Sequence, residues 1–207
     1  DAAATPQELF FYRVVGTNSN RVVSFGTTAV VALLVGRTLH VAHAGDSRAL
    51  LVREETKYGE FGCLELTVDH NYEHPGERER IQAPGSSLIF SEENKYVRPT
   101  KEEHEELKHK TDMNLPCPHL AFTRSLGHYM KGILHEPEIS SRQLGEGDVM
   151  LLLASDGIFQ CLNSRDIMGV ALDYNDPYEA ARNVVEHTIA VNYEGDIDNS
   201  TVIVAYL

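Results

Sequence analysis

A run of short apolar segments joined by short connections limits the folds that this chain can adopt more than any other feature. Ala29 to Val35 is apolar and rich in β-branched residues, a turn signal follows at Gly36-Arg37, and Thr38 to Ala42 and Arg48 to Val52 continue the pattern. Strands joined this closely pair antiparallel, because a parallel crossover needs a dozen or more residues. The stretch therefore predicts an antiparallel meander and argues against βαβ units.

Three further strands are expected. Cys63 to Val68 alternates apolar and polar residues, and Asp148 to Ala154 contains the unbroken apolar run Val149 to Leu153. A run without alternation is typical of a strand that is buried on both faces. The last strand is expected from Thr201 to Leu207.

Four helices are expected, one of them within a polar and otherwise irregular stretch from Pro84 to Pro118. The expected helices are Pro75 to Gln82, Thr100 to Lys110, a helix that Ser164 caps and that runs to about Leu172, and a helix from Asp176 to about Asn192. The last begins with an N-cap aspartate and a proline at the first helical position, a common helix start. Strands, a polar excursion, more strands, two helices and a closing strand make an α+β pattern.

The composition excludes several classes of protein. The chain has 207 residues, 42% of them hydrophobic, which suits one globular domain. A net charge of -13 argues against a nucleic-acid-binding surface, and no apolar run is long enough to cross a bilayer. Cys63, Cys117 and Cys161 have neither disulfide nor zinc spacing, so we expect free thiols and an intracellular location, in the cytoplasm or nucleus.

Three aspartates stand where predicted strands begin or end. Asp46 precedes the strand that starts at Arg48, Asp156 follows the strand that ends at Ala154, and Asp198 precedes the closing strand. Hard divalent cations bind carboxylate oxygens held on rigid elements, and strand ends supply such positions. Each aspartate alone is equally typical of a turn, through hydrogen bonds to its own backbone. Both interpretations stay open, and an EF-hand calcium loop is a weaker third because the spacings do not form one.

The histidines give no comparable signal. His40, His43, His70 and His74 have no spacing that would group them on one element, and no cysteine accompanies them. We interpret them as partly buried structural histidines.

Five blocks of residues follow one another along the chain: Thr27 to Leu33 with Leu39 to Ala49, Leu66 to His70 with Glu79 to Ile81, Leu120 to Gly127, Leu152 to Phe159, and Asp198 to Val202. In this order they resemble the metal-dependent type 2C family of protein serine/threonine phosphatases. The resemblance covers about residues 25 to 207, and five ordered blocks are far more specific than any one of them.

The resemblance implies a fold and a site. The fold is two antiparallel β-sheets sandwiched between α-helices. The site holds two Mg2+ or Mn2+ ions bridged by a water that attacks phosphoserine or phosphothreonine in a phosphoprotein substrate. Asp156 and Asp198 would be metal ligands, and Asp46, with Asp156, would help to hold a weaker third ion. Gly157 and Asn199 would shape the ligand loops, and no side chain is expected to act as a nucleophile.

Some positions depart from the family pattern. The family's early Glu-Asp pair, its Asp-Gly-His-Gly-Gly block and its phosphate-binding arginine do not occur in this chain. We therefore expect residues 1–207 to be a single phosphatase-like domain that is incomplete at its N-terminus. His128 and Gln160 stand where the family usually has aspartate.

Two interpretations follow from these departures. One is an active parent enzyme of which this chain alone is inactive. The other is a pseudophosphatase that binds or regulates without turnover. The stretch from about 84 to 118 falls where the family carries a flap beside the active site, so it is either a determinant of substrate choice or a solvated insertion.

Overall fold

The computed structural model describes residues 11–13, 20–22, 26–56, 58–91, 95–111, 117–128, 130–192 and 198–207. The chain divides into two compact units, which are described separately below. We call residues 29–69 with 137–207 the sandwich unit, and residues 1–28 with 70–136 the hairpin unit. No helix of the described residues is long and apolar enough to cross a membrane.

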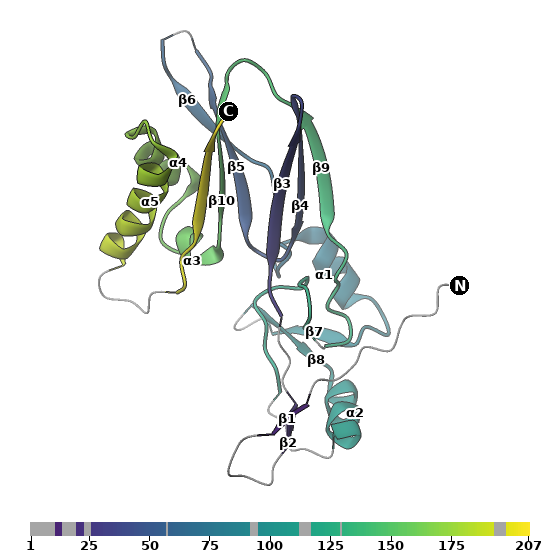
Figure 1. The fold of residues 1–207 in the computed structure, drawn as a ribbon. Coiled ribbons are helices and arrows are strands. Elements are labelled where there is room, and N and C mark those ends of the chain that lie inside the picture. The colour runs from purple at the N-terminus through teal and green to yellow at the C-terminus, as the bar shows by residue number, and fades with distance from the viewer. Residues whose placement is uncertain are drawn as a thin grey trace. The chain divides into compact units, whose positions relative to one another are not determined.

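The sandwich unit contains two antiparallel β-sheets (Figure 1). The three-stranded sheet has the order β3 (Ala29–Val35), β4 (Thr38–Ala44) and β9 (Glu138–Gln143). The four-stranded sheet has the order β11 (Val202–Tyr206), β10 (Asp148–Ala154), β5 (Arg48–Glu54) and β6 (Phe61–Glu65). The predicted meander is therefore split between the sheets: β3 and β4 pair in one sheet, and β5 belongs to the other. The α+β class and the antiparallel sheets are confirmed.

The burial of strand β10 on both faces explains its unbroken apolar run. Leu151 packs between the sheets in a buried cluster with Leu39 of β4 and Leu51 of β5. On the other face, Met150 and Leu152 belong to a second cluster under the helices. Adjacent residues of a strand point to opposite faces, so both faces of β10 must be apolar.

Three helices belong to the sandwich unit: α3 (Asp156–Phe159), α4 (Ser164–Leu172) and α5 (Pro177–Val191). α4 and α5 pack on each other and on the four-stranded sheet. Asp176 caps α5 as predicted, since its Oδ1 accepts a hydrogen bond of 3.0 Å from Glu179 N. The predicted cap of α4 is wrong by one residue. Asn163 Oδ1 accepts from the backbone of residues 165 and 166, while the Ser164 hydroxyl donates to Glu65.

The outer face of the three-stranded sheet carries exposed aliphatic side chains. Val31 and Leu33 of β3 are each 58% exposed and Ile139 of β9 is 67% exposed. In the part of the chain that the structure describes, helices of the sandwich unit therefore cover the four-stranded sheet alone.

The hairpin unit consists of short elements. They are β1 (Phe11–Arg13), β2 (Asn20–Val22), α1 (Pro75–Gln82), β7 (Leu88–Ser91), β8 (Tyr96–Pro99) and α2 (Lys101–Thr111). Both predicted helices are present. The expectation that residues 84 to 118 are irregular apart from α2 is wrong, because β7 and β8 form an antiparallel hairpin there. Leu88 and Val97 are buried in a cluster with Ile81, Met130 and Ile133. Most of that core comes from outside the stretch, so the stretch itself reads as polar.

Candidate metal centre

The strand register brings three chain segments to one edge of the four-stranded sheet. Ala154, the last residue of β10, pairs with Arg48 of β5 on one side and with Val202 of β11 on the other. Because these pairs are antiparallel, the end of β10 and the starts of β5 and β11 lie side by side. The segments that carry Asp46, Asp156 and Asp198 therefore leave the sheet at the same edge.

Gln160 joins two of these aspartates. Its Nε2 donates a hydrogen bond of 3.2 Å to Asp156 Oδ2 and one of 3.3 Å to Asp198 Oδ2. Gln160 follows α3 directly as its C-cap residue. The carboxylates of Asp156 and Asp198 thus converge on one point, although their residues are far apart in the sequence. That they bind metal stays a prediction.

The loop before β11 is held against the end of β10. The Ser155 hydroxyl donates to Asn199 O at 3.1 Å and accepts from Thr201 N at 3.0 Å. A Cβ on Gly157 would lie 2.7 Å from Asn199 O, closer than a non-bonded carbon and oxygen normally approach. Glycine at this position therefore allows the loop that carries Asp198 to approach α3.

Burial and mutual repulsion disfavour the ionised form of the carboxylates at this edge. Burial, followed by the charge of Asp156, raises the pKa of Asp46 to about 6. Burial and then the charge of Asp198 raise the pKa of Asp156. A divalent cation would offset this repulsion, and carboxylate oxygens are the ligands that Mg2+ and Mn2+ prefer. The residues present therefore fit a hard divalent cation.

Arg48 is engaged by another carboxylate of the sandwich unit. Its Nε and Nη2 donate to the two oxygens of Asp69 at 2.7 and 2.9 Å, a bidentate pair. Its guanidinium also lies 4.6 Å from the centre of the Phe159 ring. Sequence reasoning missed this pair, although both residues stand in blocks that carry the family resemblance. The cation nearest to Asp46 in the sequence is thus committed to Asp69.

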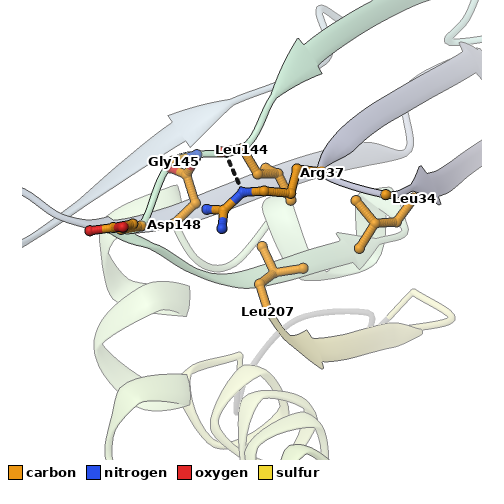
Figure 2. Close-up of a pocket in the computed structure, with 8 residues that line it drawn as sticks. Leu34, Arg37, Leu144, Gly145, Asp148 and Leu207 are labelled. Carbon is orange, nitrogen blue, oxygen red and sulfur yellow. Dashed lines mark hydrogen bonds between the residues drawn. The ribbon is translucent and has the colours of Figure 1, made fainter.

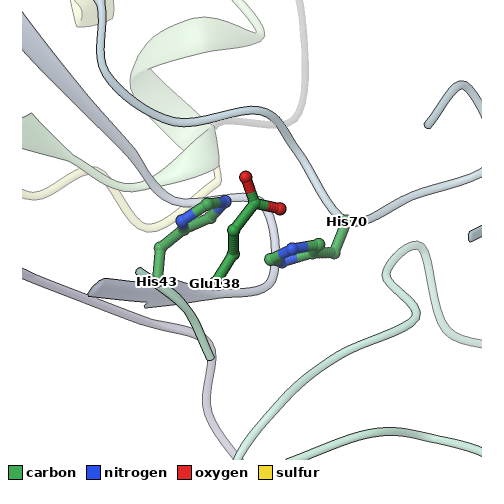
Figure 3. Close-up of side chains that lie close together, drawn as sticks. All are labelled: His43, His70 and Glu138. Atoms are coloured by element: carbon green, nitrogen blue, oxygen red, sulfur yellow. The ribbon is translucent and has the colours of Figure 1, made fainter. Parts of the chain in front are cut away.

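The histidines of the sandwich unit are held by ordinary contacts. His40 Nδ1 lies 2.7 Å from Ser141 Oγ, and the buried His43 has its Nε2 2.9 Å from Val68 O. Glu138 pairs with His43 across β4 and β9, and Figure 3 draws both side chains. The third side chain in that figure, His70, belongs to the hairpin unit, as the first residue of its 70–136 segment. The contacts of His40 and His43 agree with structural roles.

A buried ion cluster lies in the hairpin unit. Arg80 Nη2 donates to Glu77 Oε2 at 2.8 Å, and Arg124 donates to Glu77 Oε1 at 2.9 and 2.7 Å. Burial alone would raise the pKa of Glu77, but these hydrogen bonds outweigh it and lower the pKa to about 2. His128 Nδ1 lies 2.9 Å from Ser125 Oγ, and burial lowers the pKa of His128. Sequence reasoning did not foresee the Glu77 cluster.

Comparison with known proteins decides the family. The model of the protein phosphatase 2C family matches residues 10–197. The chain belongs to this family. Protein phosphatase 1K, mitochondrial, of Xenopus laevis is 35% identical over 184 residues, which are 86% of this chain and 42% of that protein. Probable protein phosphatase 2C 35 of Arabidopsis thaliana is 29% identical over 195 residues, or 88% of this chain and 56% of that protein. The chain thus spans about half the length of these relatives.

Solved structures agree on the fold. Serine-threonine phosphatase 2C of Toxoplasma gondii superposes with a TM-score of 0.72 at 24% identity, over 86% of this chain and 57% of that one. The serine/threonine phosphatase PstP/Ppp of Mycobacterium tuberculosis gives a TM-score of 0.54 at 25% identity, over 88% and 60% of the two chains. The protein phosphatase 2C fold that the sequence predicts is confirmed.

Proposed function

We propose that the protein to which this chain belongs hydrolyses phosphoserine and phosphothreonine in proteins with the help of Mg2+ or Mn2+. The observation that carries the proposal is the convergence of Asp156 and Asp198, both hydrogen-bonded to one amide nitrogen of Gln160. Membership of the protein phosphatase 2C family supports phosphoproteins as the substrate class. The raised pKa of Asp46 supports a third carboxylate that a cation would stabilise.

Each aspartate has a distinct role in this proposal. Asp156 and Asp198 would hold the two catalytic ions, and Asp46, with Asp156, would hold a weaker third ion. When bound, the ions would lower the pKa of an attacking water and neutralise charge on the phosphoryl oxygens. The side-chain oxygen of Gln160 would accept a hydrogen bond from that water, and Gly157 keeps the Asp198 loop close to α3. No side chain of the chain needs to form a bond to phosphorus.

A catalytically inactive binding module is the second candidate, and Gln160 is the observation that favours it. At this position the family pattern usually has aspartate, whereas an amide brings no charge for a cation. Its Nε2 also donates to Asp156 and Asp198, which occupies the oxygens that a metal would need. In that case the fold would recognise a partner protein and release no phosphate.

Two further expectations belong to the proposal. The family's early aspartate block does not occur in residues 1–207, so this chain alone should bind divalent metal weakly and release little phosphate. The three cysteines are free thiols, which supports an intracellular protein.

Phosphate release from a phosphothreonine peptide tests the proposal. The measurement compares Mn2+ with a chelator, on a longer protein that contains the family's early block. Asp198→Asn keeps the side-chain shape and should lower turnover by about 10²-fold or more, because it removes one electrostatic element of the transition-state clamp. Asp173→Asn, an exposed aspartate at the end of α4, is the matched control and should leave turnover unchanged. Chelator-insensitive turnover, or none with Mn2+, would refute the metal-dependent enzyme.

A further inference from the structure

A cavity lies at the other end of the strands that carry the aspartates. It is open to solvent and has a volume of about 360 Å³. Its walls belong to the sandwich unit: Leu34 and Arg37 at the β3–β4 turn, the loop from Leu144 to Asp148 between β9 and β10, and Leu207 after β11 (Figure 2). β10 runs seven residues from this end to the aspartate edge, which is about 20 Å at roughly 3.3 Å per residue. The cavity is therefore separate from the candidate metal centre.

Arg37 is positioned in this cavity by the loop opposite it. Its Nε donates to Leu144 O at 3.3 Å, and Leu144 N donates to Arg37 O at 2.8 Å. Gly36, whose φ is 62°, gives the turn its backbone geometry. The bond to Leu144 uses Nε, and no described residue pairs with the two terminal nitrogens of the guanidinium. Arg37 is exposed, and its guanidinium offers two parallel N–H donors from a side chain that one hydrogen bond orients.

The nearest buried carboxylate does not neutralise Arg37. Asp148 Oδ2 accepts from Gly145 N at 2.7 Å, and its Oδ1 lies 3.6 Å from Arg53 Nε in an ion pair. The remaining charged side chain is Glu146, which is exposed at the rim. Arg37 is the one cationic side chain among the described residues that line the cavity. Its guanidinium therefore matches a ligand with a single carboxylate.

The rest of the lining is aliphatic. Leu144 is buried, whereas Leu34 and Leu207 are 47% and 43% exposed and lie beside Arg37 (Figure 2). A guanidinium fork beside apolar walls is complementary to a carboxylate that carries an aliphatic group. We infer that this cavity binds an aliphatic carboxylate, with the carboxylate on Arg37 and the tail on the leucines. A free small acid and the C-terminus of a peptide that ends in an aliphatic residue share this chemistry.

A titration of the 207-residue chain followed by amide NMR tests the inference. N-acetyl-leucine should shift the signals of residues 34–37 and 144–148 with low-millimolar affinity. N-acetyl-leucinamide has the same shape without the charge and should bind at least about tenfold more weakly, because a charged hydrogen-bonded pair is lost. Arg37→Gln should weaken acid binding by a similar factor. Arg165→Gln makes the same charge change at an exposed site on α4 and should bind as the unaltered chain does.

A peptide arm separates the two sources of the carboxylate. A tetrapeptide that ends in leucine with a free carboxylate is compared with N-acetyl-leucine. Tighter binding of the peptide assigns the site to protein C-termini, and tighter binding of the amino-acid derivative assigns it to a small acid. Equal binding of the acid and the amide, unchanged binding by folded Arg37→Gln, or shifts elsewhere in the chain would each overturn the inference. Phosphate release plays no part in this test, so its outcome is independent of the proposed enzyme.

Discussion

Two carboxylates, the buried Glu77 of the hairpin unit and the half-buried Asp46 of the sandwich unit, have pKa values shifted in opposite directions. In the hairpin unit Glu77 is 1% exposed, and Arg80 and Arg124 supply its positive charge, so its pKa falls to about 2. In the sandwich unit Arg48 is bound to Asp69, and burial together with Asp156 raises the pKa of Asp46 to about 6. A carboxylate paired with arginine stabilises the fold, whereas carboxylates crowded without a cation fit an added one.

Glu77→Gln should have the largest effect on stability. The change leaves Arg80 and Arg124 beside a neutral amide at a buried position, and breaking a buried pair on one side costs about 3 to 5 kcal/mol. Urea unfolding followed by signals of the hairpin unit measures the loss. Glu105→Gln is the control, because Glu105 is an exposed glutamate paired with Lys108 and should not move the midpoint. Equal midpoints for both variants would show that the cluster is not a stabilising core.

The metal-free chain should lose stability as pH rises from 3.8 toward the folded pKa of Asp46, about 6. The folded pKa of about 6 exceeds the ordinary value of 3.8, so the folded state binds more protons in that window. The stability that this proton contributes is present below pH 3.8 and is lost as pH rises to about 6, on the order of 3 kcal/mol. Asp46→Asn should remove this slope, measured as unfolding free energy in chelator. Matching profiles for the two chains would contradict the prediction.

Glu77 gives the opposite dependence of the unfolding free energy on pH. Its folded pKa of about 2 lies below the ordinary 4.5, so its contribution is present above pH 4.5 and is lost as pH falls toward 2. The two slopes have opposite signs and their pH windows overlap only between 3.8 and 4.5, so both can be read from one series of unfolding curves.

The sequence predicts those parts of the fold that local chemistry decides. β10 follows from its unbroken apolar run, and the start of α5 follows from Asp176 and Pro177. β9 has no such signal. Five of its six residues are polar or charged, and four in a row are exposed, so its place comes from backbone pairing with β4. β6 ends earlier than predicted, at Glu65. Beyond it, the Thr67 hydroxyl accepts the hydrogen bond of 3.1 Å from Ala49 N in place of a backbone carbonyl.

The candidate metal centre is likewise predicted only in part by the sequence. Asp46, Asp156 and Asp198 can be found from the sequence as strand-end carboxylates. Their convergence depends on Ala154 pairing with both Arg48 and Val202, and no local pattern encodes a pairing between distant strands. The Arg48–Asp69 and Glu77–Arg124 pairs were missed for the same reason, since 21 and 47 positions separate the partners.

Mn2+ should stabilise the sandwich unit through its aspartates. At about ten times its dissociation constant, a metal that binds only the folded state adds about 1.4 kcal/mol. Asp156→Asn should abolish this increment, whereas Asp173→Asn at the exposed end of α4 should keep it. Unfolding curves with Mn2+ and with chelator measure the difference. An increment that survives Asp156→Asn would place the metal elsewhere and end the contrast between the units.

Gln160→Glu should change the unfolding free energy least, and the change should differ without and with Mn2+. The variant keeps the side-chain length but replaces the amide that donates to Asp156 and Asp198 with a third negative charge. Without metal, the unfolding free energy should fall by about 1 kcal/mol, because Gln160 is exposed and solvent screens the repulsion. With Mn2+ the added charge should tighten metal binding and offset the loss. Gln160→Ala removes the same hydrogen bonds without adding charge, so it should lose stability without gaining metal affinity. If Gln160→Glu binds Mn2+ no better than Gln160→Ala, the carboxylates are not arranged for a cation, and the binding-module function becomes the better account of this edge.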